Sequence, residues 1–162
     1  FHEFKRESFA SSLKDAVAAI FGWDRELLEG RTKASREWRE QVDEWWATRL
    51  GIPTLTPRWI LQNWGTDILR AHFHDDIWIA SLENKIRKTQ DNIVISDVRF
   101  PNEAEAIRSL GGKVIRINRE GVGPVNDHPS ETSMDGYPFD VVIENSGSIE
   151  DFHRLIGCVV SV

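Results

Sequence analysis

Apolar residues follow two patterns along the chain, short continuous runs and helical spacing. The run at residues 93–95 is typical of a strand that is buried on both faces in a parallel sheet. Further strands are predicted at residues 4–9, 113–118 and 139–143. Helical spacing predicts helices over residues 57–73, 77–86 and 101–110, a first one that ends at residue 21 and a last one that ends near residue 156. Strand, helix and strand with short connections predict a right-handed parallel unit and an α/β fold.

The segment from residue 23 to residue 53 differs from its surroundings because it is rich in Trp, Arg and Glu. Trp38, Val42 and Trp45 recur at helical spacing, so we expect a packing face rather than a platform on which bases stack. The segment therefore predicts a helical insertion outside the sheet. With the helices that follow, it gives a helical region of about residues 23–90.

Composition limits the class of protein. A chain of 162 residues with 40% hydrophobic content can bury one core, so a single domain over residues 1–162 is predicted. The net charge of −6 argues against a general nucleic-acid or membrane-surface binder, although clustered arginines could hold a small phosphate compound. The one cysteine, Cys158, excludes an internal disulfide and is predicted to be a buried, inert thiol. Without a bilayer-spanning apolar stretch or a signal peptide, we predict a cytoplasmic protein.

The first candidate catalytic site lies at the end of the strand predicted at residues 93–95. Asp97 and Arg99 follow its last apolar residue, and Pro101 begins the next helix. Ligands of open α/β sheets bind at the carboxyl ends of the strands, which makes this acid and this arginine candidates for catalysis. The alternative is structural, with Asp97 capping the next helix and Arg99 pairing with Glu103 one turn on.

A second candidate site lies along the helix predicted at residues 57–73. Polar side chains at intervals of four share one side of it, namely Arg58, Gln62, Thr66 and Arg70. Because arginine forks match phosphate oxygens, this stripe resembles a grip for a phosphate and a base; a solvated face is the alternative. Gly65 costs about 1 kcal/mol in a helix interior, which indicates the close approach of a ligand or another backbone. Lys14, early in the first helix, is either solvated or meets an anion, and we count it as a candidate substrate ligand.

Residues 121–138 form a polar loop that is too long for a plain connection. Long loops in compact domains are usually functional lids or disordered segments. The loop contains His128, Ser130 and Glu131, but no nucleophile-elbow glycine pattern surrounds the serine, so a hydrolase triad is not predicted. A lid-like loop is the prediction that remains.

Six motifs in chain order together resemble a known family. They are SFASSLKDAVAAIFG, PRWILQNWGTDILR, DIWIASL, ISDVRFPNEAEAI, NDHPSE and VVIENSGSIEDF. This ordered set, which covers nearly the whole chain, is similar to the deoxynucleoside monophosphate kinases of many bacteriophages, a branch of the P-loop nucleotide kinases. The resemblance implies a three-layer α/β domain of P-loop nucleoside monophosphate kinase type, with a parallel sheet and a helical substrate-binding insertion. It also implies transfer of the terminal phosphoryl group of ATP to a deoxynucleoside monophosphate, with Mg²⁺, in the host cytoplasm if the source is viral.

The resemblance further implies roles for particular side chains. The substrate would be bound by Arg58, Gln62, Gly65, Thr66, Arg70, Trp78 and Glu103. The groups at the phosphates would be Asp97, Arg99 and Arg119, with Asp97 directed towards Mg²⁺ or its water shell. His128 and Glu131 would belong to the lid, and Asn145 would lie beside the adenine of ATP. The implied partners are small-molecule nucleotides, without nucleic acid or membrane, and a homodimer stays open because seven tryptophans could form an interface as well as a core.

One part of the family pattern is missing from these 162 residues, the GxxxxGK[ST] loop whose backbone amides cradle the phosphates of ATP. We expect the first strand, this loop and the first helix to precede Phe1, since the chain has no initiator methionine; the alternative is that the protein has lost them. Two other functions therefore stay open. One is a catalytically inactive module that binds a monophosphate, and the other is a kinase for another small phosphorylated metabolite.

Overall fold

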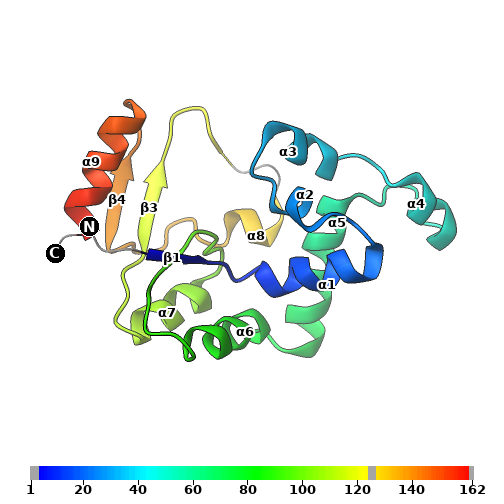
Figure 1. The fold of residues 1–162 in the computed structure, drawn as a ribbon, viewed down its shortest axis with the longest axis horizontal. Helices are drawn as coiled ribbons and strands as arrows, with labels where there is room; N and C mark the ends of the chain where they lie inside the picture. The colour runs from blue at the N-terminus through cyan, green and yellow to red at the C-terminus, as the bar shows by residue number, and fades with distance from the viewer. Residues whose placement is uncertain (1–3, 124–126, 161–162) are drawn as a thin grey trace. The chain divides into compact units, whose positions relative to one another are not determined.

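The structure, a computed structural model, describes residues 4–123 and 127–160, and the chain divides after Val98 into two compact units. The first unit contains β1 (Phe4–Glu7), α1 (Ser11–Phe21), α2 (Arg25–Glu29), α3 (Lys33–Arg39), α4 (Glu44–Leu50), α5 (Pro57–Gln62), the π-helix η1 (Asn63–Phe73), α6 (Ile77–Ile86) and β2 (Asn92–Ile95) (Figure 1). The second unit contains α7 (Pro101–Ser109), β3 (Ile115–Asn118), α8 (Pro129–Thr132), β4 (Val141–Glu144) and α9 (Ile149–Val160).

Each unit has a parallel pair of strands. In the first, β1 pairs with β2, with Phe4 opposite Asn92; in the second, β3 pairs with β4, with Ile115 opposite Val141. The α/β character and the parallel pairing are therefore confirmed. The prediction that the strand at 93–95 is buried on both faces is wrong, because Val94 is 45% exposed. Among the described residues β2 has only β1 as a ladder partner, and so small a sheet cannot be covered as a central strand would be.

The core of the first unit is built on α1. Leu13, Val17 and Phe21 are buried and recur every four residues, which puts them on one face of the helix. Gly22 ends the helix in the left-handed conformation, with φ of 68°, which glycine adopts without steric cost. The ring of Phe21 packs on three tryptophans, with centroids 4.4 Å from Trp23, 4.9 Å from Trp46 and 5.4 Å from Trp64. Trp23, Trp46 and Trp64 are therefore packing residues.

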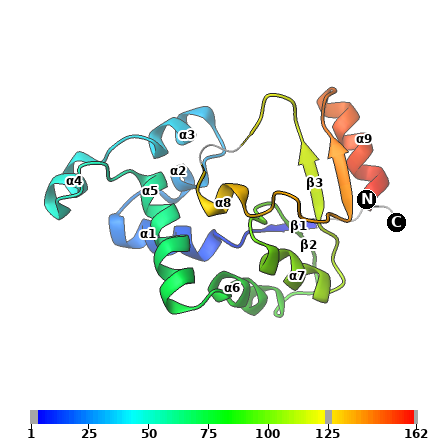
Figure 2. The same cartoon turned by 180° about the vertical axis from the view of Figure 1, so that it is seen from behind.

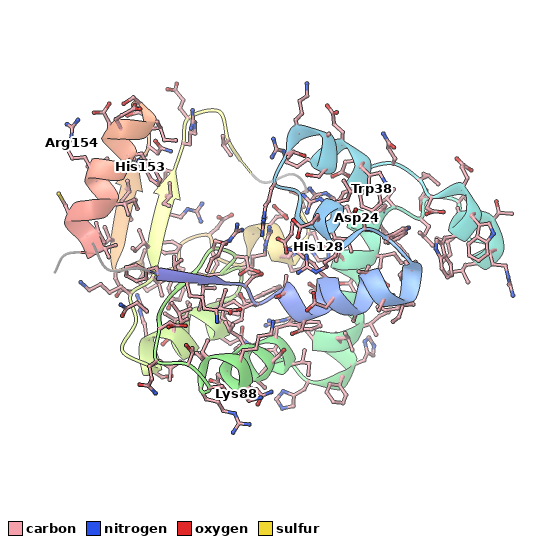
Figure 3. All side chains as sticks on the ribbon, viewed as in Figure 1. Asp24, Trp38, Lys88, His128, His153 and Arg154 are labelled. Atoms are coloured by element: carbon pink, nitrogen blue, oxygen red, sulfur yellow. The ribbon has the colours of Figure 1, made fainter. Side chains whose placement is uncertain are left out.

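The predicted stripe through Trp38, Val42 and Trp45 is wrong, although the segment is helical. The helix α3 ends at Arg39, and α4 begins at Glu44 after a break. The break occurs because the carboxylate of Asp43 accepts the N–H of Trp46 at 3.1 Å and starts a new helix. Trp38, labelled on α3 in Figure 3, therefore packs edge-on against Trp23 at 6.0 Å, whereas Trp45 is mostly exposed.

The helix predicted at residues 57–73 is continuous, but it changes register at Asn63. Beyond α5 the chain forms η1, where bonds span five residues, as in the bond from the N–H of His74 to the carbonyl of Leu69 at 3.0 Å. The wider turn rotates later side chains away from the α-helical face. Ile68 is thus exposed although it is apolar, and Arg70, expected on the polar stripe, is buried.

The second unit is held together by a polar network around Arg108 of α7. The Arg108 guanidinium bonds to the Tyr137 hydroxyl at 2.8 Å and to Asp140 at 3.1 Å. Asp140 also accepts the N–H of Val114 at 2.7 Å. This backbone bond, followed by those from Arg108, lowers the pKa of the Asp140 carboxyl. The network fixes the segment that leads into β4 against the end of α7.

The last helix, α9, runs alongside β4 (Figures 1 and 2). His153 and Arg154 mark its middle in Figure 3. Cys158 is exposed on this helix, so the predicted buried thiol is wrong, because its position falls on the outward side. Over residues 4–123 and 127–160, none of the helices is both long and apolar enough to cross a membrane.

Candidate functional site

The carboxylate of Asp97, just after β2, closes the turn between β1 and α1. It accepts hydrogen bonds from the hydroxyl of Ser8 at 2.6 Å and from the N–H groups of Phe9 and Ala10, both at 3.0 Å. Asp97 therefore holds the turn that leads into α1, and the structural alternative that it caps the following helix is wrong, because the start of α7 is bonded by Glu103 instead. Sequence reasoning did not identify Ser8 as the partner of Asp97, because the two residues are 89 positions apart.

Arg99 makes its side-chain contacts with α8 of the second unit. Its Nη1 donates to the carbonyl of Ser130 at 2.8 Å and to Oε1 of Glu131 at 2.7 Å. Glu103, whose side chain is buried, accepts the backbone N–H of Arg99 at 2.7 Å and that of Phe100 at 3.1 Å. Glu103 thus fixes the backbone of Arg99 at the start of α7, while Glu131 fixes its guanidinium.

The four residues of the predicted phosphate- and base-binding stripe lie in different surroundings. Arg58 is half-buried and its Nε donates to Glu40 of the preceding helix–loop segment. The amide nitrogen of Gln62 is buried and has no hydrogen-bond partner among the described residues, which is costly unless a ligand or water accepts it. Thr66 is half-buried on η1. Arg70 is buried and its Nη2 lies 2.8 Å from Asp75, so its guanidinium pairs with a carboxylate instead of lying on a polar surface.

Gly65 lies where η1 meets α1 and α6. A Cβ at this position would lie 2.8 Å from a methyl group of Leu13, so the close approach expected there is made by a side chain of α1. The carbonyl of Gly65 accepts the indole N–H of Trp78 at 2.8 Å, a buried hydrogen bond. Trp78 thereby joins α6 to η1.

Lys14 belongs to a buried ion-pair network between α1 and α2. Its Nζ lies 3.1 Å from Glu29, and the two side chains are only 13% and 11% exposed. Arg25 binds the same glutamate at 2.5 Å and Asp15 at 2.6 Å. Burial opposes ionisation of Glu29, but hydrogen bonds from Arg25 and Lys14 and their charges outweigh it and lower its pKa from 4.5 to about 2. The anion that Lys14 meets in this chain is therefore Glu29, which sequence reasoning did not identify.

The remaining candidates lie on loops of the second unit. His128 caps α8, with Nδ1 accepting the N–H of Ser130 at 3.2 Å. Arg119 follows β3 and is exposed. Asn145 follows β4, and its N–H donates to the carbonyl of Asn118 at the end of β3, at 2.8 Å. Part of the predicted lid, residues 124–126, lies outside the described residues. The described remainder contains the short helix α8.

The part of the chain that the structure describes contains no preformed site for a divalent ion. No three or more His, Cys, Asp and Glu side chains are grouped there so that they could hold a metal. Asp97 already accepts three hydrogen bonds, and a carboxylate has about four acceptor positions. These residues therefore do not form a Mg²⁺ site by themselves.

Comparison with known proteins shows which family this chain resembles. The model of the deoxynucleotide monophosphate kinase family matches residues 34–156. A protein of Acanthamoeba polyphaga mimivirus, provisionally named a deoxynucleotide monophosphate kinase, is 34% identical over 172 residues, which cover 96% of this chain and 83% of the relative. The deoxynucleoside-5'-monophosphate kinase of Escherichia phage T5 is 36% identical over 88 residues, 49% of this chain and 35% of the relative.

A third relative, the deoxynucleotide monophosphate kinase of Enterobacteria phage T4, is 29% identical over 103 residues, 61% of this chain and 43% of the relative. The similarity thus covers less than half of either phage enzyme but most of the mimivirus protein. The matched range 34–156 includes the candidate residues from Arg58 to Asn145. With the family model matching most of its length, this chain belongs to the deoxynucleotide monophosphate kinase family.

Proposed function

We propose that this protein transfers the terminal phosphoryl group of ATP to a deoxynucleoside monophosphate, which yields the diphosphate. The observation that carries the proposal is the family match over residues 34–156, a range that includes the paired arginine Arg99 and the buried amide of Gln62. A kinase of this kind needs little covalent help from the protein. It needs groups that bind, orient and neutralise phosphates and that exclude water.

The proposed substrate groups are distributed over both units. In the first, the free amide of Gln62 would bind the base, with Arg58, Thr66 and Arg70 near the monophosphate and Gly65 and Trp78 shaping the wall. Lys14 would add a charge from α1. In the second, Arg99 and Arg119 would meet the phosphoryl group, Glu103 would hold Arg99, and His128 and Glu131 would belong to the lid. Asn145 would lie beside the adenine.

ATP and Mg²⁺ are proposed from the family and not from a site in the described residues. Mg²⁺ usually keeps several waters and is held largely by substrate phosphates, which suits a chain whose Asp97 has little acceptor capacity left. The ion would neutralise phosphate charge when bound. We also propose the three-layer parallel sheet of P-loop nucleoside monophosphate kinase type from the family and not from the strand pairs described. Residues 1–162 as one domain, a homodimer and a place in the host cytoplasm stay predictions.

The two other functions make different predictions. An inactive nucleotide-binding module would bind a deoxynucleoside monophosphate without consuming ATP. A kinase for another phosphorylated metabolite would prefer a phosphate compound without a base, in which case the free amide of Gln62 would have no partner on the substrate. The family match favours the nucleotide kinase over both.

The test is an ATP-dependent phosphoryl-transfer assay against a panel of deoxynucleoside monophosphates, ribonucleotides and sugar phosphates. We expect turnover of at least one deoxynucleoside monophosphate. Arg99→Ala should lower kcat about 100-fold, the usual cost of removing one charge-stabilising group, and should leave the fold intact. Arg154→Ala, which removes an exposed arginine of α9, is the matched control and should leave kcat unchanged. Near-normal turnover by Arg99→Ala would remove that residue from the mechanism, and absence of any transfer would favour the binding module.

A further inference from the structure

The guanidinium of Arg99 is hydrogen-bonded through one of its three nitrogens, and the other two nitrogens have no bond to the described residues. Both of its described side-chain bonds are made by Nη1, to the carbonyl of Ser130 and to Glu131. The Nε and Nη2 atoms have no hydrogen-bond partner among residues 4–123 and 127–160. In a planar guanidinium, Nε–H and one Nη2–H point the same way and form a two-pronged edge that fits two oxygens of one phosphate. The contacts with α8 therefore leave this phosphate-binding edge free.

Glu131, which holds Arg99, is more buried than the side chain that it holds. Glu131 is 13% exposed, compared with 46% for the side chain of Arg99. It lies in the first turn of α8, which begins at Pro129 and is capped by His128. The proline fixes its backbone φ, and the cap satisfies a free N–H at the helix start. Glu131 thus projects from a short helix whose start is fixed independently of Arg99.

Arg99 without this contact would lose its orientation. An arginine side chain has many rotamers, and its planar guanidinium binds a phosphate well only when it is already oriented. The backbone of Arg99 is fixed by Glu103, but that bond does not constrain the outer torsions of the side chain. The bonds of Nη1 to Glu131 and Ser130 constrain them.

We propose that Glu131 is a positioning residue that holds Nη1 of Arg99 so that the Nε–Nη2 edge faces the transferred phosphoryl group. The inference rests on the proposed kinase function and deepens it by giving the lid segment a second task. Because Glu131 acts through Arg99, its effect belongs to the transition state and not to substrate affinity. The carboxylate lowers the net charge at this point, but it leaves the edge that would contact phosphate unblocked.

The first experiment needs no nucleotide. The ¹⁵N relaxation of the Arg99 Nε–H group, assigned from its absence in Arg99→Ala, reports how rigid the guanidinium is. We expect an ordered Nε–H in the wild type, a mobile one in Glu131→Ala, and partial recovery in Glu131→Gln, whose amide oxygen still accepts from Nη1. Glu150→Ala, an exposed acid of α9, is the control and should change nothing. Equal order with and without Glu131 would overturn the proposal.

The second experiment is a kinetic double-mutant cycle. Glu131→Ala should lower kcat about tenfold with KM for the monophosphate changed less than twofold, and Glu131→Gln should restore most of the rate. In the Arg99→Ala background, Glu131→Ala should have no further effect, because a residue that acts through another loses its role when the other is gone. Rate losses that multiply would show that Glu131 acts separately and would refute the inference. If the wild type transfers phosphate to no nucleotide, the proposed function fails, and the relaxation measurement still decides whether Glu131 orients Arg99.

Discussion

The ion-pair network around Glu29 should make the first unit sensitive to acid in a defined range. Its carboxylate receives bonds from Lys14 at 3.1 Å and from Arg25 at 2.5 Å, and its pKa is lowered from 4.5 to about 2. A group whose pKa is lower in the folded state stabilises that state above its unfolded value and loses the effect as pH falls through the folded value. The stabilisation from Glu29 is therefore complete above about pH 5 and disappears between pH 4.5 and about pH 2.

The size of this stabilisation follows from the difference between the unfolded and folded pKa values of Glu29. A drop from 4.5 to about 2 corresponds to at most about 3.4 kcal/mol. Solvent reaches the network through the exposed carboxylate of Asp15 and screens the charges, so we expect about 1–2 kcal/mol of unfolding free energy. Glu29→Gln should remove this amount at pH 7, because Lys14 and Arg25 would keep their charges next to a neutral amide.

Urea unfolding followed by tryptophan fluorescence measures this effect directly, because all seven tryptophans lie before Val98. The difference between wild type and Glu29→Gln should be constant from pH 7 to pH 5 and should shrink to zero towards pH 2. Glu26→Gln is the matched control, since this acid of the same helix is 75% exposed and should contribute little. A difference that persists at pH 2, or one that is absent at pH 7, would refute the reasoning.

Three further outcomes are expected. Gly65→Ala should cost about 1–3 kcal/mol of unfolding free energy by urea titration, because the added Cβ would lie 2.8 Å from a methyl of Leu13; Leu13→Ala should relieve part of that loss. Asp97→Ala should leave three donors in the turn before α1 unpaired and speed hydrogen exchange of the two amides among them, at a cost of about 1–3 kcal/mol; unchanged exchange would contradict the role of Asp97 in holding this turn. Cys158, being exposed, should react with a thiol reagent in the folded protein nearly as fast as in urea.

Sequence patterns predicted the elements well because helices and strands depend on local spacing. The buried stripe of α1 and its end at Gly22 follow from residues at most four apart. The same local reasoning failed where a single polar residue competes with periodicity. Asp43 caps α4 and breaks what would otherwise be a continuous helix, and hydrophobic spacing carries no information about that competition.

The register change at Asn63 could not be predicted from spacing, because the π-helix depends on contacts outside its own sequence. The close approach of Leu13 to Gly65 and the bond from Trp78 to the Gly65 carbonyl both come from other helices. Both contacts are made at Gly65, in the first turn of η1, just after the α-helical hydrogen-bond pattern ends. Sequence therefore located the candidate residues of this helix but not which side each of them faces.

Partners distant in sequence were the least predictable part of the candidate site. Asp97 and Ser8 are separated by 89 positions, and Arg99 and Glu131 by 32. A pattern can indicate that an acid or an arginine follows a strand, but which residue it contacts depends on how strands and helices return to the same place. Both charged residues were therefore named from sequence, and neither set of contacts was.

The proposed cationic ligands share a feature that bears on how nucleotide would bind. Four of them already pair with a carboxylate of their own unit, in the pairs Lys14–Glu29, Arg58–Glu40, Arg70–Asp75 and Arg99–Glu131. Such pairs keep positive charges oriented and compensated while no phosphate is present, which matters in a chain with a net charge of −6. A phosphate could bind in two ways, by adding to a pair at a free edge, as at Arg99, or by replacing the carboxylate. The side chain of Arg70 is only 6% exposed, whereas that of Asp75 is 68% exposed, so a phosphate would have little access to the Arg70 guanidinium. Arg99, whose side chain is 46% exposed, is the easier contact to make.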